Sequence, residues 1–344
     1  MSDVEARPGE YDCGSAGAEG PEALLLPART VWLGKTTQVA RALPDRTVRM
    51  IGAWCFLDHY GPEDVSDSPG MRVWAHPHTG LQTVTWLLAG EIDHADSLGS
   101  RVRVRPGELH LMTAGRGIVH SELSPAAKPP ISFSGSPRRS SGERSGGELR
   151  RAVFLHGLQL WLALPDSARF TEPRFVSHPE LPVITGNGVT GIVLLGEIDG
   201  VASPADTYTP LLAVDLDLEP GAEITLPLTP EFEYGAFTVS GTADVAGTRV
   251  EHDQLLYLGT GRRELGLRSR EGGRILLLGG EPFAEEIVMW WNFVGRDHDE
   301  VAGYRQAWLD RADRFPPVVD RSEPVMEAPA MPSVPLRPRP RRRR

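Results

Sequence analysis

The chain has 344 residues, of which 40% are hydrophobic, so it can fill the cores of two ordinary domains or of one large one. Its formal net charge of -10 at pH 7 argues against general affinity for nucleic acid or for anionic membranes. Cys13 and Cys55 are too few for a disulfide framework or a thiolate metal cluster, and they fit a reducing cytosol. Without a secretory-type start or an apolar run near the ~18 residues that span a bilayer, the protein is expected to be globular, cytoplasmic and without a membrane partner.

The first 27 residues are rich in Gly, Ala and Glu, and we expect this leader to be disordered because it can bury little apolar surface. The rest of the chain, outside its flexible segments, consists largely of short β-type runs between Gly and Pro turns, for example Thr83–Leu88. A similar run, Gly191–Leu195, occurs further along. Many short strands with frequent turns predict an all-β barrel or sandwich.

Two tripeptides beside such runs carry ligand-type side chains two residues apart, His76 with His78 and His120 with Glu122. Residues two apart in a strand point to the same face, so each tripeptide presents both side chains to one side. If the two strands are neighbours in a small barrel, three imidazoles and one carboxylate converge. This donor set suits Fe(II), Mn, Ni, Cu or Zn about equally, so the sequence predicts a transition-metal site without selecting the metal.

The other histidines have less pattern. His94 and His110 lie near the predicted ligands in the sequence, and a role in orienting those ligands is one interpretation of them. Four further histidines are interpreted as ordinary surface or core residues, namely His59, His178, His252 and His298.

Two segments after the second tripeptide are predicted to be flexible. An insert at about residues 125–150 is rich in Ser and Arg, and the tail over residues 315–344 is rich in Pro and Arg. Between them, a short closing helix is expected over Asp299–Arg311. Its apolar face contains four residues, Val301, Tyr304, Trp308 and Leu309.

An internal repeat indicates two tandem barrels. The segment Gln82–Gly90 aligns with Glu233–Gly241, and Gly107–Gly115 aligns with Asp253–Gly261, so that both copies contain strand, Gly turn, strand and Gly turn. We therefore expect one barrel over residues 28–164 and a second over 165–314, the latter with the closing helix. The positions of the four predicted ligands fall in the second copy on residues that cannot replace them, namely Pro227, Thr229, Gly266 and Arg268. The second barrel is accordingly predicted to be metal-free.

The series of motifs resembles that of the pirin family over roughly residues 28–314. Pirins are bicupins, so the resemblance implies two tandem cupin barrels of the jelly-roll type. The segments that carry it, in order, are His76–Gly80, His94–Gly99, Pro106–Glu108, Met112–Glu122, His156–Trp161, Gly279–Pro282 and Asn292–Val294.

The resemblance also implies one mononuclear metal in the first cupin, with Fe(II) as the first expectation. Its ligands carry over onto four residues, His76, His78, His120 and Glu122. The chain departs from the family pattern at Gln82, where pirins commonly have a glutamate, so Glu122 is the only charged ligand. The insert at about 125–150 is also longer than the usual connection.

Two classes of function follow from the resemblance. Bacterial pirins resemble quercetin 2,3-dioxygenases, which implies a flavonol or other phenolic substrate, dioxygen as co-substrate and Glu122 as the base that takes the substrate's hydroxyl proton. Animal pirins imply instead an iron-binding, redox-sensitive regulator that docks on a transcription factor or a metabolic enzyme. A structural site in a storage or isomerase-type cupin is a third alternative. The chain is expected to act as a monomer.

Overall fold

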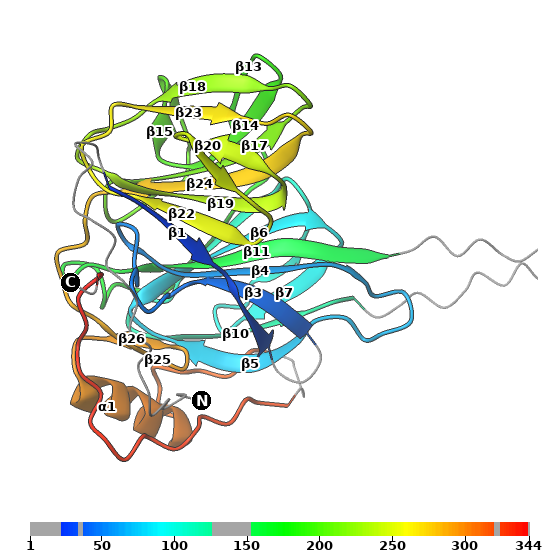
Figure 1. The fold of residues 1–344 in the computed structure, drawn as a ribbon. Coiled ribbons are helices and arrows are strands. Elements are labelled where there is room, and N and C mark those ends of the chain that lie inside the picture. The colour runs from blue at the N-terminus through cyan, green and yellow to red at the C-terminus, as the bar shows by residue number, and fades with distance from the viewer. Residues whose placement is uncertain (1–21, 34–36, 126–152, 320–323, 343–344) are drawn as a thin grey trace, which may run out of the picture.

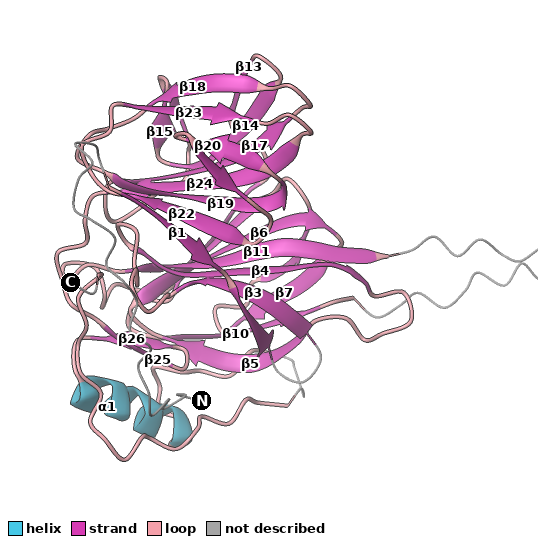
Figure 2. Cartoon of the chain, in the orientation of Figure 1, coloured by secondary structure: helices cyan, strands magenta, loops and turns pink. Residues whose placement is uncertain are grey.

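The computed structural model describes residues 22–33, 37–125, 153–319 and 324–342. These residues form an almost entirely β structure with one helix (Figures 1 and 2). Two barrels lie one above the other, the first made mainly of the blue and cyan strands of Figure 1 and the second mainly of the green and yellow ones. The all-β fold class and the tandem barrels predicted from the sequence are confirmed. The leader over residues 1–21 and the insert over residues 126–152 lie outside the described residues.

The first barrel consists of a large and a small antiparallel sheet. The large sheet contains, in spatial order, β12 (Arg174–His178), β9 (Leu109–Thr113), β6 (Leu81–Ala89), β11 (Phe154–Ala163), β4 (Trp54–Asp64), β3 (Thr37–Leu43) and β2 (Arg29–Leu33). The small sheet contains β5 (Arg72–His78), β10 (Ile118–Leu123), β7 (Ile92–Asp96) and β8 (Arg101–Val104).

The second barrel repeats this arrangement. Its large sheet contains, in order, β1 (Ala23–Pro27), β22 (Gln254–Leu258), β19 (Glu233–Gly241), β24 (Gly273–Gly280), β17 (Leu211–Leu218), β14 (Val189–Leu195) and β13 (Val183–Gly186). Its small sheet contains β18 (Glu223–Pro227), β23 (Glu264–Arg268), β20 (Ala243–Val245) and β21 (Thr248–Val250). Two short ribbons, β15 (Glu197–Ile198) with β16 (Val201–Ala202) and β25 (Val288–Trp290) with β26 (Phe293–Gly295), complete the strands among the described residues.

The aligned repeat segments occupy equivalent places in the two large sheets. β6 and β9 are neighbours in the first barrel, and β19 and β22 are neighbours in the second. The interior of the second barrel is filled by aliphatic side chains such as Val214, Leu256 and Leu267. That filling agrees with the loss of ligand-type residues that the sequence alignment indicates in the second copy.

Each large sheet has a border strand from a part of the sequence that lies outside its own predicted barrel. β1, from the predicted leader, pairs along its whole length with β22 of the second barrel, and Figure 1 shows the dark-blue strand beside the yellow one. β12, from the segment assigned to the second barrel, pairs with β9 of the first. The boundary at residue 164 therefore does not separate two independent sheets. Periodicity within a strand contains no information about which sheet it joins.

The two barrels share one hydrophobic core that includes Trp54 and Trp86, both fully buried. Each indole N–H crosses to the second barrel: Trp54 Nε1 donates to the carbonyl oxygen of Gly279 at 3.1 Å, and Trp86 Nε1 donates to Asp215 Oδ2 at 2.6 Å. Arg274 also donates to both oxygens of the buried Asp215 carboxylate, at 2.8 and 2.6 Å. Apolar burial and these directional bonds fix the relative orientation of the barrels.

The helix α1 (His298–Leu309) confirms the predicted closing helix within about two residues. Asp297 caps its N-terminus by accepting from the Glu300 backbone N–H at 2.8 Å. Val301 and Tyr304 are buried as expected, whereas Leu309 is 46% exposed, so its assignment to the apolar face was wrong. Among the described residues, no helix is both long and apolar enough to cross a bilayer.

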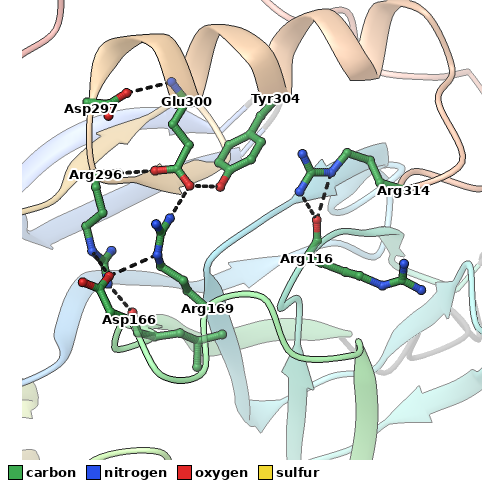
Figure 3. A network of polar contacts seen from close by, with 9 residues as sticks. Arg116, Asp166, Arg169, Arg296, Asp297, Glu300, Tyr304 and Arg314 are labelled. Carbon is green, nitrogen blue, oxygen red and sulfur yellow. Dashed lines mark hydrogen bonds and ion pairs between the residues drawn. The ribbon is translucent and has the colours of Figure 1, made fainter.

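Polar contacts attach α1 to the first barrel (Figure 3). Glu300 accepts from the backbone N–H of Arg296 at 2.7 Å, from the Arg169 guanidinium and from the Tyr304 hydroxyl. In the segment that follows the helix, Arg314 donates to the carbonyl oxygen of Arg116, at 3.0 and 2.5 Å. Arg116 lies in the turn that leads into β10, so this segment supports a strand that carries predicted ligands.

The described part of the C-terminal tail differs from the predicted disordered segment. Met326 donates its backbone N–H to the carbonyl oxygen of Ala75 at 2.8 Å, next to His76, and accepts from the indole N–H of Trp308 at 3.1 Å. Further along, Arg341 forms an ion pair with the buried Glu233 carboxylate of the second barrel. These contacts join sites far apart in the sequence, which composition alone could not reveal.

Asp215→Ala tests the polar link between the barrels. The change leaves the Trp86 indole N–H and the partly buried Arg274 guanidinium without their shared acceptor, and we expect a loss of about 3 kcal/mol in the free energy of unfolding. Urea denaturation followed by Trp fluorescence measures the loss. Asp217→Ala, at an exposed position of the same strand, is the control and should change stability by less than about 0.5 kcal/mol. Equal effects of the two changes would contradict the assignment.

Candidate metal centre

The two strands that carry the predicted ligands are hydrogen-bonded neighbours in the small sheet of the first barrel. β5 and β10 pair antiparallel, with His120 directly opposite His76 and Ile118 opposite His78. The register of this pairing shifts between His120 and Glu122. The structure thus brings together the two tripeptides that stand out in the sequence.

The three imidazoles of His76, His78 and His120 form a compact cluster. Their ligand nitrogens all lie within 4.8 Å of one another, and the Nε2 atoms of His76 and His78 are 3.0 Å apart. Ring centroids are separated by 4.4 to 5.0 Å. All three side chains are at most 5% exposed. A close cluster of buried imidazoles is the arrangement that a transition-metal ion requires of its ligands.

Backbone carbonyl groups orient two of these rings. His76 Nδ1 is 2.8 Å from the carbonyl oxygen of Trp74, and His78 Nδ1 is 3.0 Å from that of Asn292. An Nδ1–H donated to a carbonyl leaves the lone pair on Nε2, the nitrogen that faces the cluster. Because Asn292 lies between β25 and β26, the closing segment of the chain helps to position a ligand on β5.

Glu122 belongs to an overlapping cluster. Its carboxylate and the ring nitrogens of His94 and His120 lie within 4.8 Å of one another, so His120 is common to both groups. His94 is directly opposite Glu122 in the pairing of β7 with β10. Thr85 Oγ1 lies 3.1 Å from Glu122 Oε1 and 3.1 Å from Gln159 Oε1, and its single proton can serve one of them at a time.

Burial keeps the imidazoles neutral and favours the protonated form of the carboxyl group. Desolvation lowers the pKa of His76 to about 4 and holds the pKa values of His78 and His120 well below the usual range. Desolvation also raises the pKa of Glu122, against the opposing effects of His94 and Thr85. Neutral imidazoles are ready to bind a metal without first losing a proton.

A second observation, besides the short distances, indicates that these residues fit a metal ion. Both ring nitrogens of His120 are buried and have no hydrogen-bond partner among the described residues. A buried nitrogen without a partner costs about 1–3 kcal/mol. Coordination through one of these nitrogens would remove part of that cost, so the ring is placed as a ligand would be rather than as part of a satisfied polar cluster.

The other residues singled out from the sequence lie at varying distances from the imidazole cluster. His94 stacks on Phe175 with a centroid separation of 4.3 Å and contacts the cluster as described. His110 instead has its Nδ1 2.9 Å from Ser177 Oγ and its Nε2 3.4 Å from Glu108. Gln82 is buried and donates to Thr113 Oγ1 at 2.9 Å, so its amide has a structural partner.

Sequence reasoning missed Thr85 and Tyr60. The Tyr60 hydroxyl is buried without a partner in the described part of the chain, and burial with the nearby Glu122 charge raises its pKa well above the usual value. Thr83 and Thr85 follow the His-Pro-His tripeptide in the sequence. They are two residues apart, so in a strand their side chains share a face. This alternation was the available signal for Thr85; for Tyr60 we find none, since its neighbours come from distant strands.

Comparison with known families agrees with the resemblance to pirins that the sequence motifs indicate. The chain matches the family model of pirin over residues 36–162 and that of the pirin C-terminal cupin domain over residues 213–316. The chain belongs to the pirin family. Its two barrels are therefore the two cupins of a pirin, and the buried His and Glu cluster lies in the N-terminal cupin.

Two relatives and one solved structure are similar to this chain over most of its length. A Pseudomonas aeruginosa protein provisionally named quercetin 2,3-dioxygenase is 41% identical over 96% of this pirin and 98% of its own length. Human pirin is 32% identical over 68% of this chain and 74% of its own. The crystal structure of a quercetin 2,3-dioxygenase from Acinetobacter baumannii superposes with a TM-score of 0.81 at 39% identity, covering 91% of this chain and 96% of the other.

Gly80→Ala should disturb the turn that follows His78. Gly80 has φ +68°, and a Cβ atom there would lie 2.2 Å from the carbonyl oxygen of Val294. We expect a loss of about 3 kcal/mol or more in stability and weaker metal retention after dialysis.

Gly107→Ala is the matched control for this change. Gly107 has a similar φ of +83° but no atom within 4 Å of the added Cβ, so only the conformational cost of about 1 kcal/mol remains. Indistinguishable urea midpoints for the two variants would contradict the proposed close contact with the closing segment.

His78→Ala should remove one equivalent of bound metal relative to the wild type, because it deletes one of three clustered imidazoles. Elemental analysis of untagged protein after dialysis measures the loss. His178→Ala, outside the cluster, should retain the wild-type content. Unchanged metal content in a folded His78→Ala protein would show that this cluster is not a metal site.

Proposed function

We propose that this pirin is a metal-dependent dioxygenase that opens the heterocyclic ring of a flavonol or a similar phenolic substrate, in the manner of quercetin 2,3-dioxygenase. His76, His78, His120 and Glu122 hold one transition metal, with iron as Fe(II) the first expectation and Mn, Ni, Cu or Zn as alternatives. When bound, the metal supplies coordination positions at which substrate and dioxygen can be brought together.

The observation that carries this proposal is the buried Glu122 carboxylate beside His120, which also belongs to the cluster of three neutral imidazoles. Desolvation raises the pKa of Glu122, which makes its ionised form a stronger base than an exposed glutamate. A flavonol hydroxyl has to lose its proton before the ring can be attacked by dioxygen. The relatives with the quercetin 2,3-dioxygenase name support the same chemistry.

The surrounding residues have supporting roles in this proposal. When the Thr85 hydroxyl donates to Glu122 rather than to Gln159, it keeps one carboxylate oxygen oriented. Phe175 stacks on His94 and helps to hold that ring beside Glu122. Glu122 accepts the hydroxyl proton, and exclusion of bulk water limits side reactions of the deprotonated substrate.

Glu122→Gln separates the role of base from that of ligand. The amide keeps the shape of the side chain but cannot accept the substrate proton, so we expect at least a 100-fold loss of kcat with quercetin. Oxygen uptake and carbon monoxide release are measured together, with the metal content of each preparation. Gln82→Glu, which adds a carboxylate where pirins commonly have one, serves as a variant that should retain turnover.

Full turnover by a metal-loaded Glu122→Gln protein would exclude the base assignment. A wild-type protein that holds one metal in this cluster but consumes no oxygen with several flavonols would favour the second class of function. That class is a redox-sensitive regulator whose metal changes a surface for a protein partner, as the likeness to animal pirins implies.

A further inference from the structure

A second group of ligand-type side chains lies at the junction of the two barrels, apart from the four residues discussed above. His59 comes from β4 of the first barrel, whereas His252 and Asp253 form the turn between β21 and β22 of the second. His156, from β11, lies beside His59. No sequence pattern connects His59 with His252, because residues from different barrels share no periodicity.

The donor atoms of this group are close enough to share one ion. The ligand atoms of His59, His252 and Asp253 all lie within 4.8 Å of one another. His59 Nδ1 is 2.7 Å from Asp253 Oδ1, and His252 Nε2 is 3.2 Å from Asp253 Oδ2. Two ligands bound tetrahedrally to zinc at its usual bond lengths lie about 3.3 Å apart, so small shifts of exposed side chains would complete the geometry.

His156 holds the His59 ring in place. His59 Nε2 is 2.8 Å from His156 Nε2, and the His59 side chain is only 1% exposed. If His59 Nδ1 binds an ion, the remaining proton is on Nε2 and is donated to His156. A ligand histidine whose second nitrogen donates to a fixed acceptor is the usual arrangement at metal sites.

The turn that carries the other two donors is also fixed. The backbone N–H of Asp253 donates to the carbonyl oxygen of Thr238 at 2.9 Å, and its own carbonyl oxygen accepts from Ala28 at 2.8 Å. The His252 side chain is 52% exposed and the Asp253 side chain 31% exposed. An ion could therefore enter from solvent and keep water as a further ligand.

We propose that His59, His252 and Asp253 form a second site for a divalent transition metal with zinc-like ligand preference, which links the two barrels, with His156 as a positioning residue for His59. This site does not depend on the proposed dioxygenase activity. It is also distinct from the equivalent of the first metal centre inside the second barrel, whose ligand positions remain occupied by Pro, Thr, Gly and Arg.

Zinc binding in a His120→Ala background isolates the second site, because His120 belongs to both donor groups of the first centre. Isothermal titration of the untagged full chain with Zn²⁺ should give one equivalent in His120→Ala and at least a tenfold weaker affinity in His120→Ala/His252→Ala. His120→Ala/His178→Ala is the matched control and should bind like the single variant. Zn²⁺ should also raise the Tm of His120→Ala but not of His120→Ala/His252→Ala, because an ion that binds only the folded form stabilises it.

Two variants in the wild-type background keep the proposal testable if His120→Ala folds poorly. His252→Ala changes an exposed residue, and Asp253→Asn keeps a residue type that tolerates the φ of +58° at this position. Each should lower the zinc content from two equivalents to one after dialysis. Retention of two equivalents in both variants, or one equivalent in the wild type that His252→Ala does not alter, would overturn the second site and leave a hydrogen-bonded cluster.

Discussion

The antiparallel pairing of β5 with β10 is the constraint on which the candidate metal centre depends. It sets His76 opposite His120. On the other side of β10, the regular antiparallel pairing with β7 places Glu122 opposite His94. A slip of one residue would turn these side chains to the other face of the sheet. The second barrel keeps the equivalent pairing of β18 with β23 but fills its interior with aliphatic side chains. The same frame therefore supports either a donor cluster or an ordinary core.

Much of this arrangement could be predicted from the sequence because it follows from local periodicity. Residues two apart in a strand share a face, so His76 with His78 and His120 with Glu122 were recognisable as two pairs of donors. The internal repeat then predicted two barrels, and the matching strand orders of the large sheets confirm it. The choice of these four residues as ligands remains a prediction, since proximity alone does not identify an ion or its coordination.

Features that join distant parts of the chain could not be predicted in this way. The partnership of Thr85 with Glu122 depends on which strands face each other across the barrel. The contacts of the C-terminal segment, such as the ion pair of Arg341 with Glu233, occur in a stretch whose composition indicates disorder. The interbarrel cluster around His59 likewise requires two domains to be docked before its donors meet. The local sequence pattern predicts the strands and which side chains share a face. These long-range contacts depend instead on how the strands and the two barrels pack against one another.

The exchange of border strands has a consequence for how this architecture can be divided. Cutting the chain near residue 164 would leave β9 without β12 in one fragment and β22 without β1 in the other. Each bare edge would offer unpaired backbone groups to strands of other molecules, which favours aggregation of both fragments. The half with the candidate metal centre, transplanted alone into a fusion protein, would need its border strand grafted with it. For protein engineering, the two barrels are accordingly one indivisible unit.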